Sequence, residues 1–363
     1  MKAIAQRMLM LSLIASAAAL GAAEGTLLRP VVGAIRWDAW SGGGVTKQVE
    51  KTLGPEKYHY RLPWFAQVDS NNTVRIDGSQ QTVMGQEIDY AAEAGLDYWA
   101  FLLYPEAESM SVALKQYLAN AKRGRINFCL ILHNTFGVSD DQWPRERERA
   151  VALLKEPGYQ TVLGGRPLIY AFGVKGDRAG ARLAEFRQAT TRAGMNPYLV
   201  YMGWNPAADY ARETTNGFDA VSAYAYGSAQ ATFAELAESV EKQYWHQAAQ
   251  AHVPCVPLVT TGWDKWPRKE HPVSWEMSQG YHKQEVFPAT ARPEEIAAHL
   301  EHAIDFVRDH AEICAAKAVI IYAWNEHDEG GWLVPTWTPG GKPDTARLDA
   351  LRKVLSPVRI KGR

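Results

Sequence analysis

Eight short, almost continuously apolar runs recur along the chain, and a longer amphipathic stretch follows each of them. The runs span residues 30–37, 96–104, 126–133, 166–172, 197–204, 218–226, 253–263 and 317–325. A strand buried on both faces of a parallel sheet has this kind of sequence, because neither face needs polar side chains. Eight such strands alternating with helices predict a single (β/α)8 TIM barrel. A doubly wound open sheet is the alternative, but the first run lacks the Gly-rich phosphate-binding turn of such sheets.

The stretches between the runs have the pattern of amphipathic helices. Apolar side chains recur at three- and four-residue steps in residues 180–194, 234–252, 293–311 and 344–355. The helix expected at 86–95 ends at Gly95, which suits a left-handed C′ position. The helix expected at 139–156 begins with Ser139 and Asp140 as N-cap candidates. Residues 41–82 predict an extended first βα loop that passes over the mouth of the barrel.

The N-terminus has the three parts of a secretory signal peptide. Lys2 and Arg7 form a basic region, residues 8–20 are apolar, and small residues follow. The apolar part is shorter than the about 20 residues that span a bilayer, although an uncleaved anchor is the alternative. We therefore expect a signal peptide at 1–23, one domain at 24–363, a secreted or periplasmic protein, and no membrane association after cleavage.

Charge and cysteine content exclude several classes of partner. The formal net charge is −1, so nothing indicates a nucleic-acid or anionic-membrane partner. The three cysteines, Cys129, Cys255 and Cys314, are widely spaced and form neither a disulfide framework nor a zinc pattern. Cys129 and Cys255 lie inside apolar runs and are expected to be small buried hydrophobic residues.

Aromatic, amide and carboxylate side chains gather where the expected strands end. In a barrel of this kind the functional site lies at the carboxyl ends of the strands. Aromatic rings cover the apolar face of a sugar, while amides and carboxylates bind its hydroxyls. We therefore expect a carbohydrate substrate, bound by Trp37, Asp38, Tyr104, His133, Asn134, Trp204, Tyr224, Tyr226, Trp263, Asp264, Arg268 and Asn325.

Each member of this set also has a structural interpretation. His133 could be a hydrogen-bonded structural histidine, Asp264 and Arg268 could form only an ion pair, and Trp37 with Trp40 could plug the top of the barrel. The concentration of polar groups at one end of the strands is stronger support than any single residue.

The stretch WNEHDEGGW, residues 324–332, follows the last apolar run and contains four consecutive ionisable side chains. A solvated turn would explain the charges but not the flanking tryptophans. A metal site is not expected, because neither the EF-hand spacing nor spaced His and Cys ligands are present. Glu326 and Glu329 are three residues apart, which suits the separation of about 5–5.5 Å between the carboxyl groups of retaining glycosidases. We predict that they form a catalytic pair.

The motif YAWNEHDEGGWLVP, residues 322–335, resembles the last-strand motif of glycoside hydrolase family 99-like proteins. This grouping includes endo-α-1,2-mannosidases and WbsX-type proteins often labelled glycosyltransferases. Weaker similarities lie at 85–104, 164–172, 259–268 and 344–355, and the resemblance spans roughly 31–356.

The resemblance implies a (β/α)8 barrel and a role for each glutamate. Glu326 would deprotonate the 2-hydroxyl of the substrate, and Glu329 would protonate the leaving oxygen and later activate water. His327 and Asp328 replace the Trp-His of the mannosidases, and Val334 stands where many WbsX-type members have Glu, so we expect a different sugar-binding shell.

The predicted function is that of an exported, retaining glycoside hydrolase that acts on a poly- or oligosaccharide without a cofactor or metal. A non-catalytic carbohydrate-binding barrel and a WbsX-type glycosyltransferase are the alternatives. The transferase would need a nucleotide-sugar donor, which exported compartments generally lack.

Overall fold

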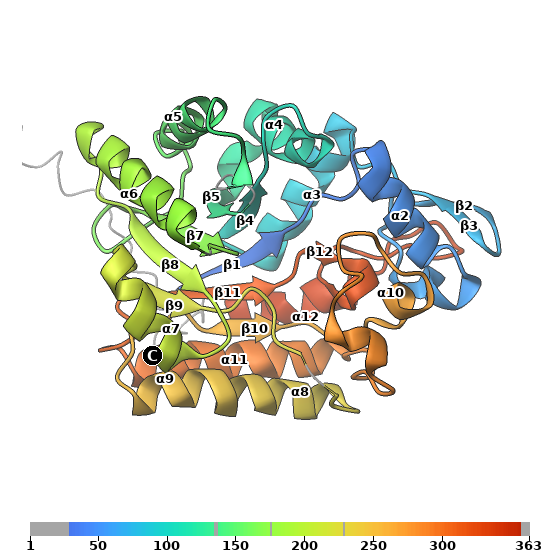
Figure 1. Ribbon diagram of the computed structural model, residues 1–363. Helices are drawn as coiled ribbons and strands as arrows, with labels where there is room; N and C mark the ends of the chain where they lie inside the picture. Colours follow the sequence, from blue (N-terminus) through green and yellow to red (C-terminus); the bar gives the residue numbers. More distant parts are fainter. Residues whose placement is uncertain (1–28, 134–136, 175, 228, 357–363) are drawn as a thin grey trace, which may run out of the picture.

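A computed structural model of the chain describes residues 29–133, 137–174, 176–227 and 229–356. Eight parallel strands form the central sheet, in the order β10-β11-β1-β4-β5-β7-β8-β9. They are β1 (Val31–Arg36), β4 (Tyr98–Leu103), β5 (Asn127–Leu132), β7 (Arg166–Phe172), β8 (Tyr198–Met202), β9 (Ala220–Ser222), β10 (Leu258–Thr260) and β11 (Ala318–Tyr322). Each lies inside one of the eight apolar runs, and the predicted (β/α)8 barrel is confirmed (Figure 1).

The barrel is closed between β9 and the segment that leads into β10. The Val221 amide donates to the Pro254 carbonyl, and the Val256 amide donates to the Val221 carbonyl, both over 2.9 Å. These two bonds continue the parallel ladder in front of β10, whose regular part begins only at Leu258. The expected strand 253–263 is therefore irregular over its first half.

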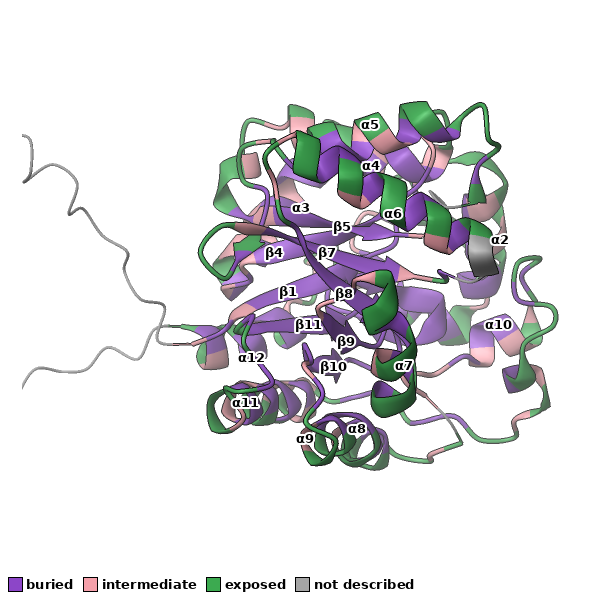
Figure 2. Cartoon of the chain, turned by 60° about the vertical axis from the view of Figure 1, so that its left-hand side comes forward, coloured by how far each residue is buried: buried purple, intermediate pink, exposed green. Residues whose placement is uncertain are grey.

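Helices surround the sheet, and their outward faces are exposed while the strands are buried (Figure 2). They are α3 (Gln81–Ala94), α4 (Val112–Ala119), α5 (Trp143–Leu153), α6 (Gly176–Arg192), α7 (Pro206–Glu213), α8 (Phe233–Val240), α9 (His246–Gln250), α10 (Trp266–Glu270), α11 (Pro293–Asp309) and α12 (Ala346–Leu355). Among the described residues, no helix is both long and apolar enough to cross a membrane.

Of the two helix ends predicted from the sequence, one is confirmed and the other is wrong. Gly95 follows α3 with a φ of 87°, so its left-handed conformation is confirmed. The predicted N-cap at Ser139 and Asp140 is wrong, because α5 begins at Trp143 and Gln142 precedes it. Asp140 instead accepts hydrogen bonds from two arginines of α6, Arg178 and Arg182, over 2.7 Å each.

The first βα connection carries α2 (Gly43–Leu53), a 3-10 helix (Glu56–Arg61) and the hairpin of β2 (Gln67–Ser70) and β3 (Thr73–Arg75). It packs against the loop that follows β11, since the Trp64 amide donates to the Pro335 carbonyl over 2.9 Å and Pro63 pairs with Thr336. Figure 1 shows this extension beside α10, beyond the carboxyl ends of the strands. The extended first loop is thus confirmed.

The interior of the barrel is filled by strand side chains, and one of them requires a glycine on the neighbouring strand. Tyr98 on β4 is fully buried, and its hydroxyl bonds the Tyr170 hydroxyl over 2.8 Å and the Val319 carbonyl over 3.0 Å. Gly33 is its register partner on β1, and a Cβ there would lie 2.2 Å from the Tyr98 ring. The ring therefore occupies the space that a side chain at position 33 would need.

We predict that Gly33→Ala lowers the free energy of unfolding by about 1–3 kcal/mol, because it overpacks the interior. Urea denaturation followed by tryptophan fluorescence measures the change. Gly44→Ala is the matched control, since a Cβ at this helical position of α2 has no neighbour within 4 Å. Equal stabilities for the Gly33 variant and the native chain would contradict this description of the barrel interior.

Candidate active site

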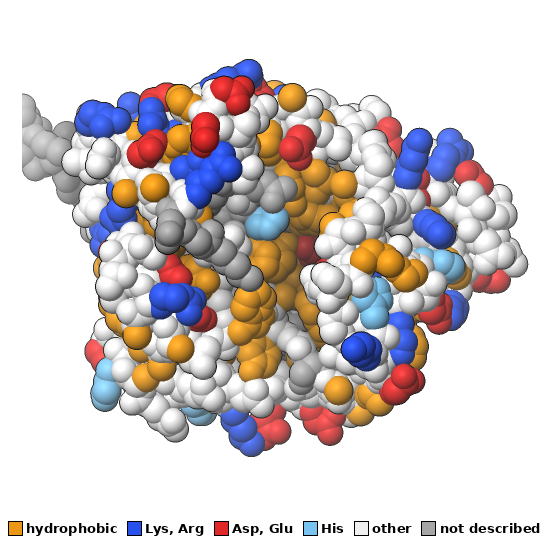
Figure 3. All heavy atoms as spheres, in the orientation of Figure 1, with side chains coloured by type: hydrophobic (Ala, Val, Ile, Leu, Met, Phe, Trp, Pro, Cys, Tyr) orange, Lys and Arg blue, Asp and Glu red, His pale blue; other side chains and the backbone are white. Residues whose placement is uncertain are grey.

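A cavity of about 550 Å³ opens at the carboxyl ends of the strands. Its walls are largely hydrophobic, and acidic atoms are visible at its floor (Figure 3). The lining includes nine residues predicted from the strand ends: Trp37, Tyr104, His133, Trp204, Tyr224, Trp263, Arg268, Glu326 and Glu329. The predicted side chains therefore meet at one rim of the barrel. They follow seven of the eight strands, namely β1, β4, β5, β8, β9, β10 and β11.

The two glutamates lie on a short hairpin that follows β11. Asn325–Glu326 (β12) pairs antiparallel with Gly331–Trp332 (β13), and His327–Glu329 form a 3-10 turn between them. Gly330 has a φ of 87°, and a Cβ at this position would lie 2.3 Å from the Asp264 amide nitrogen. The hairpin can therefore pack directly on the loop after β10 only with glycine at position 330.

This hairpin is buried, so the interpretation of residues 324–332 as a solvated turn is wrong. His327 and Asp328 are fully buried, and Glu326 and Glu329 are 3% and 6% exposed. The His327 ring lies between Trp40 and Trp332 and contacts the Arg61 carbonyl through Nδ1. Charges in such a place need partners, because leaving them unpaired away from water costs several kcal/mol.

Glu326 has a single strong partner. Its Oε1 accepts a hydrogen bond from the Tyr224 hydroxyl over 2.6 Å. Its Oε2 has no hydrogen-bond partner among the described residues, and the nearest cation, Nη2 of Arg268, is 3.7 Å away. Burial, together with the charge of Glu329, raises the pKa of Glu326 well above its ordinary value. The protonated form of this carboxyl group is therefore favoured relative to that of an exposed glutamate.

Glu329 lies in a more positive environment. Its Oε1 contacts the Arg268 guanidinium and lies 3.0 Å from Nζ of Lys265, and its Oε2 accepts from the Tyr322 hydroxyl. Burial raises the pKa of Glu329, whereas Arg268 and Lys265 oppose that rise, and the net shift is upward. The pair thus combines a carboxyl whose pKa is raised by burial and by a neighbouring carboxylate with one whose ionised form two cations favour.

Arg268 on α10 connects these groups. Its guanidinium donates to both oxygens of Asp328, over 2.7 and 3.0 Å, and also contacts Glu329. Its Nη1 lies 3.0 Å from Oε2 of Glu276. The residue is 1% exposed and lies over the ring of Trp37. The sequence suggested an ion pair between Asp264 and Arg268, but the structure pairs Asp264 with Arg61 instead, over 2.5 Å.

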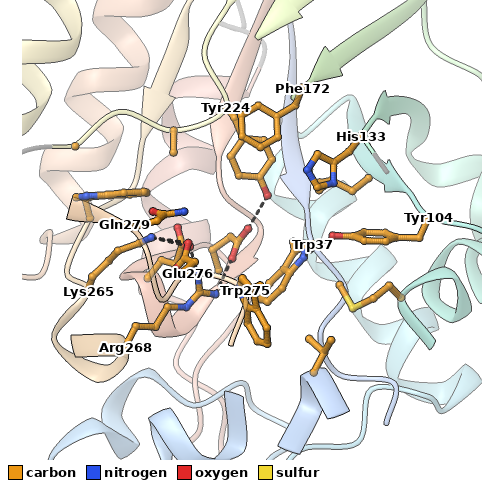
Figure 4. Close-up of a pocket in the computed structure, with 18 of the residues that line it drawn as sticks. Trp37, Tyr104, His133, Phe172, Tyr224, Lys265, Arg268, Trp275, Glu276 and Gln279 are labelled. Atoms are coloured by element: carbon orange, nitrogen blue, oxygen red, sulfur yellow. Dashed lines mark hydrogen bonds and ion pairs between the residues drawn. The ribbon is translucent and has the colours of Figure 1, made fainter. Parts of the chain in front are cut away.

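A third carboxylate, Glu276, was missed by the sequence analysis (Figure 4). Its Oε1 lies 2.9 Å from Nζ of Lys265, and its Oε2 accepts from Arg268 and the Tyr281 hydroxyl, over 3.0 Å each. Burial alone would raise the pKa of Glu276, but Arg268 and Lys265 lower it to about 2. Glu276 is therefore a permanent anion that shares both cations with Glu329.

Aromatic rings form two walls of the cavity (Figure 4). On one wall, the His133, Phe172 and Tyr224 rings form a stack, with centroid distances of 5.2 and 4.7 Å. On the other wall, Trp37 and Trp275 lie 5.7 Å apart, and Trp275 is 39% exposed. These rings give the cavity apolar walls against which the apolar part of a ligand can pack.

Phe172, Lys265, Trp275, Glu276 and Gln279 also line the cavity and were absent from the predicted set. Phe172 is the last residue of β7, so the strand-end rule would have found it. Lys265 directly follows the predicted pair at 263 and 264. Residues 275–279 lie in a loop between α10 and a 3-10 helix at Gly280–Lys283, where no sequence pattern indicates direction.

Four predicted sugar contacts do not line the cavity. Asp38 is held by Arg36 over 2.7 Å, and burial raises its pKa to about 6. Asn325 accepts from the Trp37 amide over 2.8 Å and donates to Asp38 over 3.3 Å. Asp264 pairs with Arg61 as described, and the Tyr226 hydroxyl donates to Gln243 over 2.6 Å. These side chains point into the surrounding framework, which makes them supports of the site. Asn134 lies outside the described residues.

Trp37 illustrates this support. Its amide bonds Asn325, and its indole Nε1 donates to the Tyr104 hydroxyl over 2.9 Å. Both bonds fix the indole plane on the cavity wall. Within the described ranges, no group of three or more His, Cys, Asp or Glu side chains is arranged to hold a metal ion.

The buried Arg268 generates the first prediction about the site. Arg268→Met would leave Asp328, Glu329 and Glu276 without their shared cation, and we expect the free energy of unfolding to fall by about 3–5 kcal/mol. Arg75→Met removes an exposed ion pair with Asp69 and is the control, for which no measurable change is expected. Chemical denaturation measures the change in the free energy of unfolding for both variants. An Arg268 variant as stable as the control would contradict the network.

The second prediction concerns acid stability. Burial lowers the pKa of His133 from 6.5 to about 4, and its Nδ1 has no hydrogen-bond partner in the described structure. Between these pH values the unfolded chain binds a proton that the native chain does not, so stability falls as the pH falls.

We expect His133→Gln to reduce this slope by up to about 1.4 kcal/mol per pH unit. Unfolding measured from pH 7 to pH 4 tests it, with the exposed His246→Gln as the control. An unchanged slope would show that His133 titrates normally.

Comparisons with known proteins bear on the fold. No protein-family model and no curated protein sequence matches the chain. Two solved structures of the GH99 endo-alpha-mannosidase from Bacteroides thetaiotaomicron are similar to it. The one in complex with BIS-TRIS-Propane has 12% identity and a TM-score of 0.55, over 89% of this chain and 94% of that chain. The other has 13% identity and a TM-score of 0.54, over 89% and 95%. The chain therefore has a GH99-like (β/α)8 fold.

Proposed function

We propose that this chain is a retaining glycoside hydrolase, in which Glu326 and Glu329 cleave a glycosidic bond of a poly- or oligosaccharide. One observation carries the proposal: two buried glutamates, bridged by Arg268, lie at the floor of a cavity with aromatic walls. A cavity of about 550 Å³ has room for a few sugar rings. The GH99-like fold and the family resemblance of residues 322–335 support the same function.

The free acceptor on Glu326 supports its role as a base. A sugar hydroxyl that donates to Oε2 would stabilise the ionised form of this carboxyl and lower its pKa. The proton of the pair would then reside on Glu329, next to the leaving group. Glu326 would take the proton of the 2-hydroxyl, whose oxygen displaces the leaving group that Glu329 protonates. Glu329 would then deprotonate a water that opens the resulting intermediate, and Glu326 would return its proton to the 2-oxygen, so the configuration is retained.

The surrounding residues would bind and orient the substrate. Trp37 and Trp275 on one side and Phe172 and Tyr224 on the other would pack against the apolar parts of the sugar rings. Because Lys265 and Arg268 are already paired with carboxylates, they would hold the charge of Glu329 and would not attract an anionic sugar.

The signal-peptide pattern of residues 1–23, which lie outside the described ranges, supports export as part of the proposal. The protein would act outside the cytoplasm on a carbohydrate, without a nucleic-acid or membrane partner. N-terminal sequencing of protein from the exported fraction tests this, and a chain that still begins at Met1 would contradict it.

The function is tested by incubating the mature protein with a panel of plant, fungal and bacterial polysaccharides and analysing the released sugars. We expect hydrolysis of at least one glycan without any nucleotide sugar. Binding to a glycan array without product would favour the non-catalytic barrel. Turnover that depends on a nucleotide sugar would establish the glycosyltransferase.

We predict that Glu326→Gln and Glu329→Gln each reduce turnover by about 10²–10⁴-fold, the usual contribution of a general acid or base. Ligand binding is expected to survive, because an amide still donates and accepts hydrogen bonds. The Glu329 variant should lose least on substrates with good leaving groups, which need little protonation, whereas the Glu326 variant should show no such relief.

The matched control is Glu108→Gln, a carboxylate on the rim of the same cavity. Turnover near the native rate in both hairpin variants would place the chemistry elsewhere. If only the Glu326 variant lost less turnover on substrates with good leaving groups, Glu326 would be the acid and Glu329 the base.

A further inference from the structure

Cys255 and Cys314 are 59 residues apart in the sequence but lie side by side, with a distance of 4.0 Å between their sulfur atoms. Both are 1% exposed. Cys129, in contrast, lies on β5, whose neighbours in the sheet are β4 and β7 and not the strands near the other two cysteines. The wide spacing of the three cysteines gave no indication of this pairing.

The backbone holds the two cysteines together. The Cys255 amide donates to the Ile313 carbonyl over 2.9 Å, so the residue before Cys314 is bonded directly to Cys255. The Cys314 amide donates to the His310 carbonyl over 3.0 Å, and its carbonyl accepts from Lys317 over 2.8 Å. Cys255 also forms a β-bridge with Val221. Both thiols therefore sit on a fixed frame at the amino-terminal ends of β10 and β11, opposite the cavity.

We propose that Cys255 and Cys314 form a disulfide bond when the chain folds in contact with a disulfide oxidant. A thiolate of one cysteine attacks the external disulfide and forms a mixed disulfide, which the second thiolate then displaces. One bond forms between the two sulfur atoms, the external disulfide is reduced to two thiols, and the two cysteine protons are transferred to them or to solvent. The sulfur atoms must approach from 4.0 Å to about 2.05 Å, so bond formation requires the two side chains to rotate toward each other.

The bond would close the segment that carries the two cations of the site. Lys265, Arg268 and Glu276 all lie between Cys255 and Cys314 in the sequence, with β10, α10 and α11. A cross-link at the base of this segment would restrict the unfolded chain and so stabilise the folded one. The inference concerns a modification site remote from the cavity and does not depend on hydrolysis.

To test this, the full-length chain is refolded in glutathione disulfide or in reduced glutathione and alkylated under denaturing conditions. Its mass is then measured by mass spectrometry. The chain contains three cysteines, so we expect three alkylated thiols in the reduced sample and one in the oxidised sample. Non-reducing trypsin digestion should link residues 243–265 to residues 309–317. Three free thiols after oxidative refolding to the native circular dichroism, or a link to Cys129, would overturn the proposal.

Thermal unfolding supplies the matched comparison. The oxidised chain is expected to melt about 5 °C above the reduced chain, and Cys129→Ala should keep this difference while Cys255→Ala and Cys314→Ala abolish it. Peptide mapping of the unsubstituted chain decides the question if a variant fails to fold. A linked peptide without any rise in melting temperature would overturn the inference that the bond stabilises this segment.

Discussion

The buried guanidinium of Arg268 is the interaction on which the rest of the site depends. It bonds both oxygens of Asp328, contacts Glu329 and lies 3.0 Å from Glu276. Without a cation at this position, three carboxylates would lie close together away from water with only Lys265 to offset their charge, which would destabilise the hairpin after β11. Arg268 lies on α10, in the connection after β10, whereas Asp328 and Glu329 lie in the connection after β11. Ion pairs therefore hold the last two βα connections together.

Two features tune the carboxylate pair within these connections. Glu276 competes with Glu329 for Lys265 and Arg268, which limits how far these cations can ionise Glu329. Glu326 lies farther from Arg268, at 3.7 Å, and burial raises its pKa despite that cation. Close approach of the two loops makes this possible: Gly262 and Gly330 bring backbone against backbone, because a Cβ at Gly262 would lie 2.2 Å from the Gly330 carbonyl.

The sequence predicted the barrel because buried parallel strands are recognisable from composition alone, and the rule that function lies at their carboxyl ends located nine of the residues that line the cavity. The rule gives a position but not a direction, so Asp38 and Asn325 were assigned to the sugar although both turn into the framework around Arg36. Glu276 and Trp275 were not predicted, because they lie in a loop whose sequence has no periodic pattern. The contact between Cys255 and Cys314 was not predicted either, because it depends on the closure of the barrel.

The central claim is that the fold raises the pKa of the Glu326 carboxyl by burying it in the same hairpin as Glu329. Carbon-13 NMR of protein labelled at the glutamate carboxyl carbon, titrated from pH 3 to pH 9, measures this without a substrate. The account predicts one carboxyl signal that titrates well above the ordinary Glu pKa of about 4.3 and that disappears in Glu326→Gln. If every glutamate titrates at or below the ordinary value, burial does not raise the pKa of Glu326, and the proposed division of acid and base roles loses its physical basis.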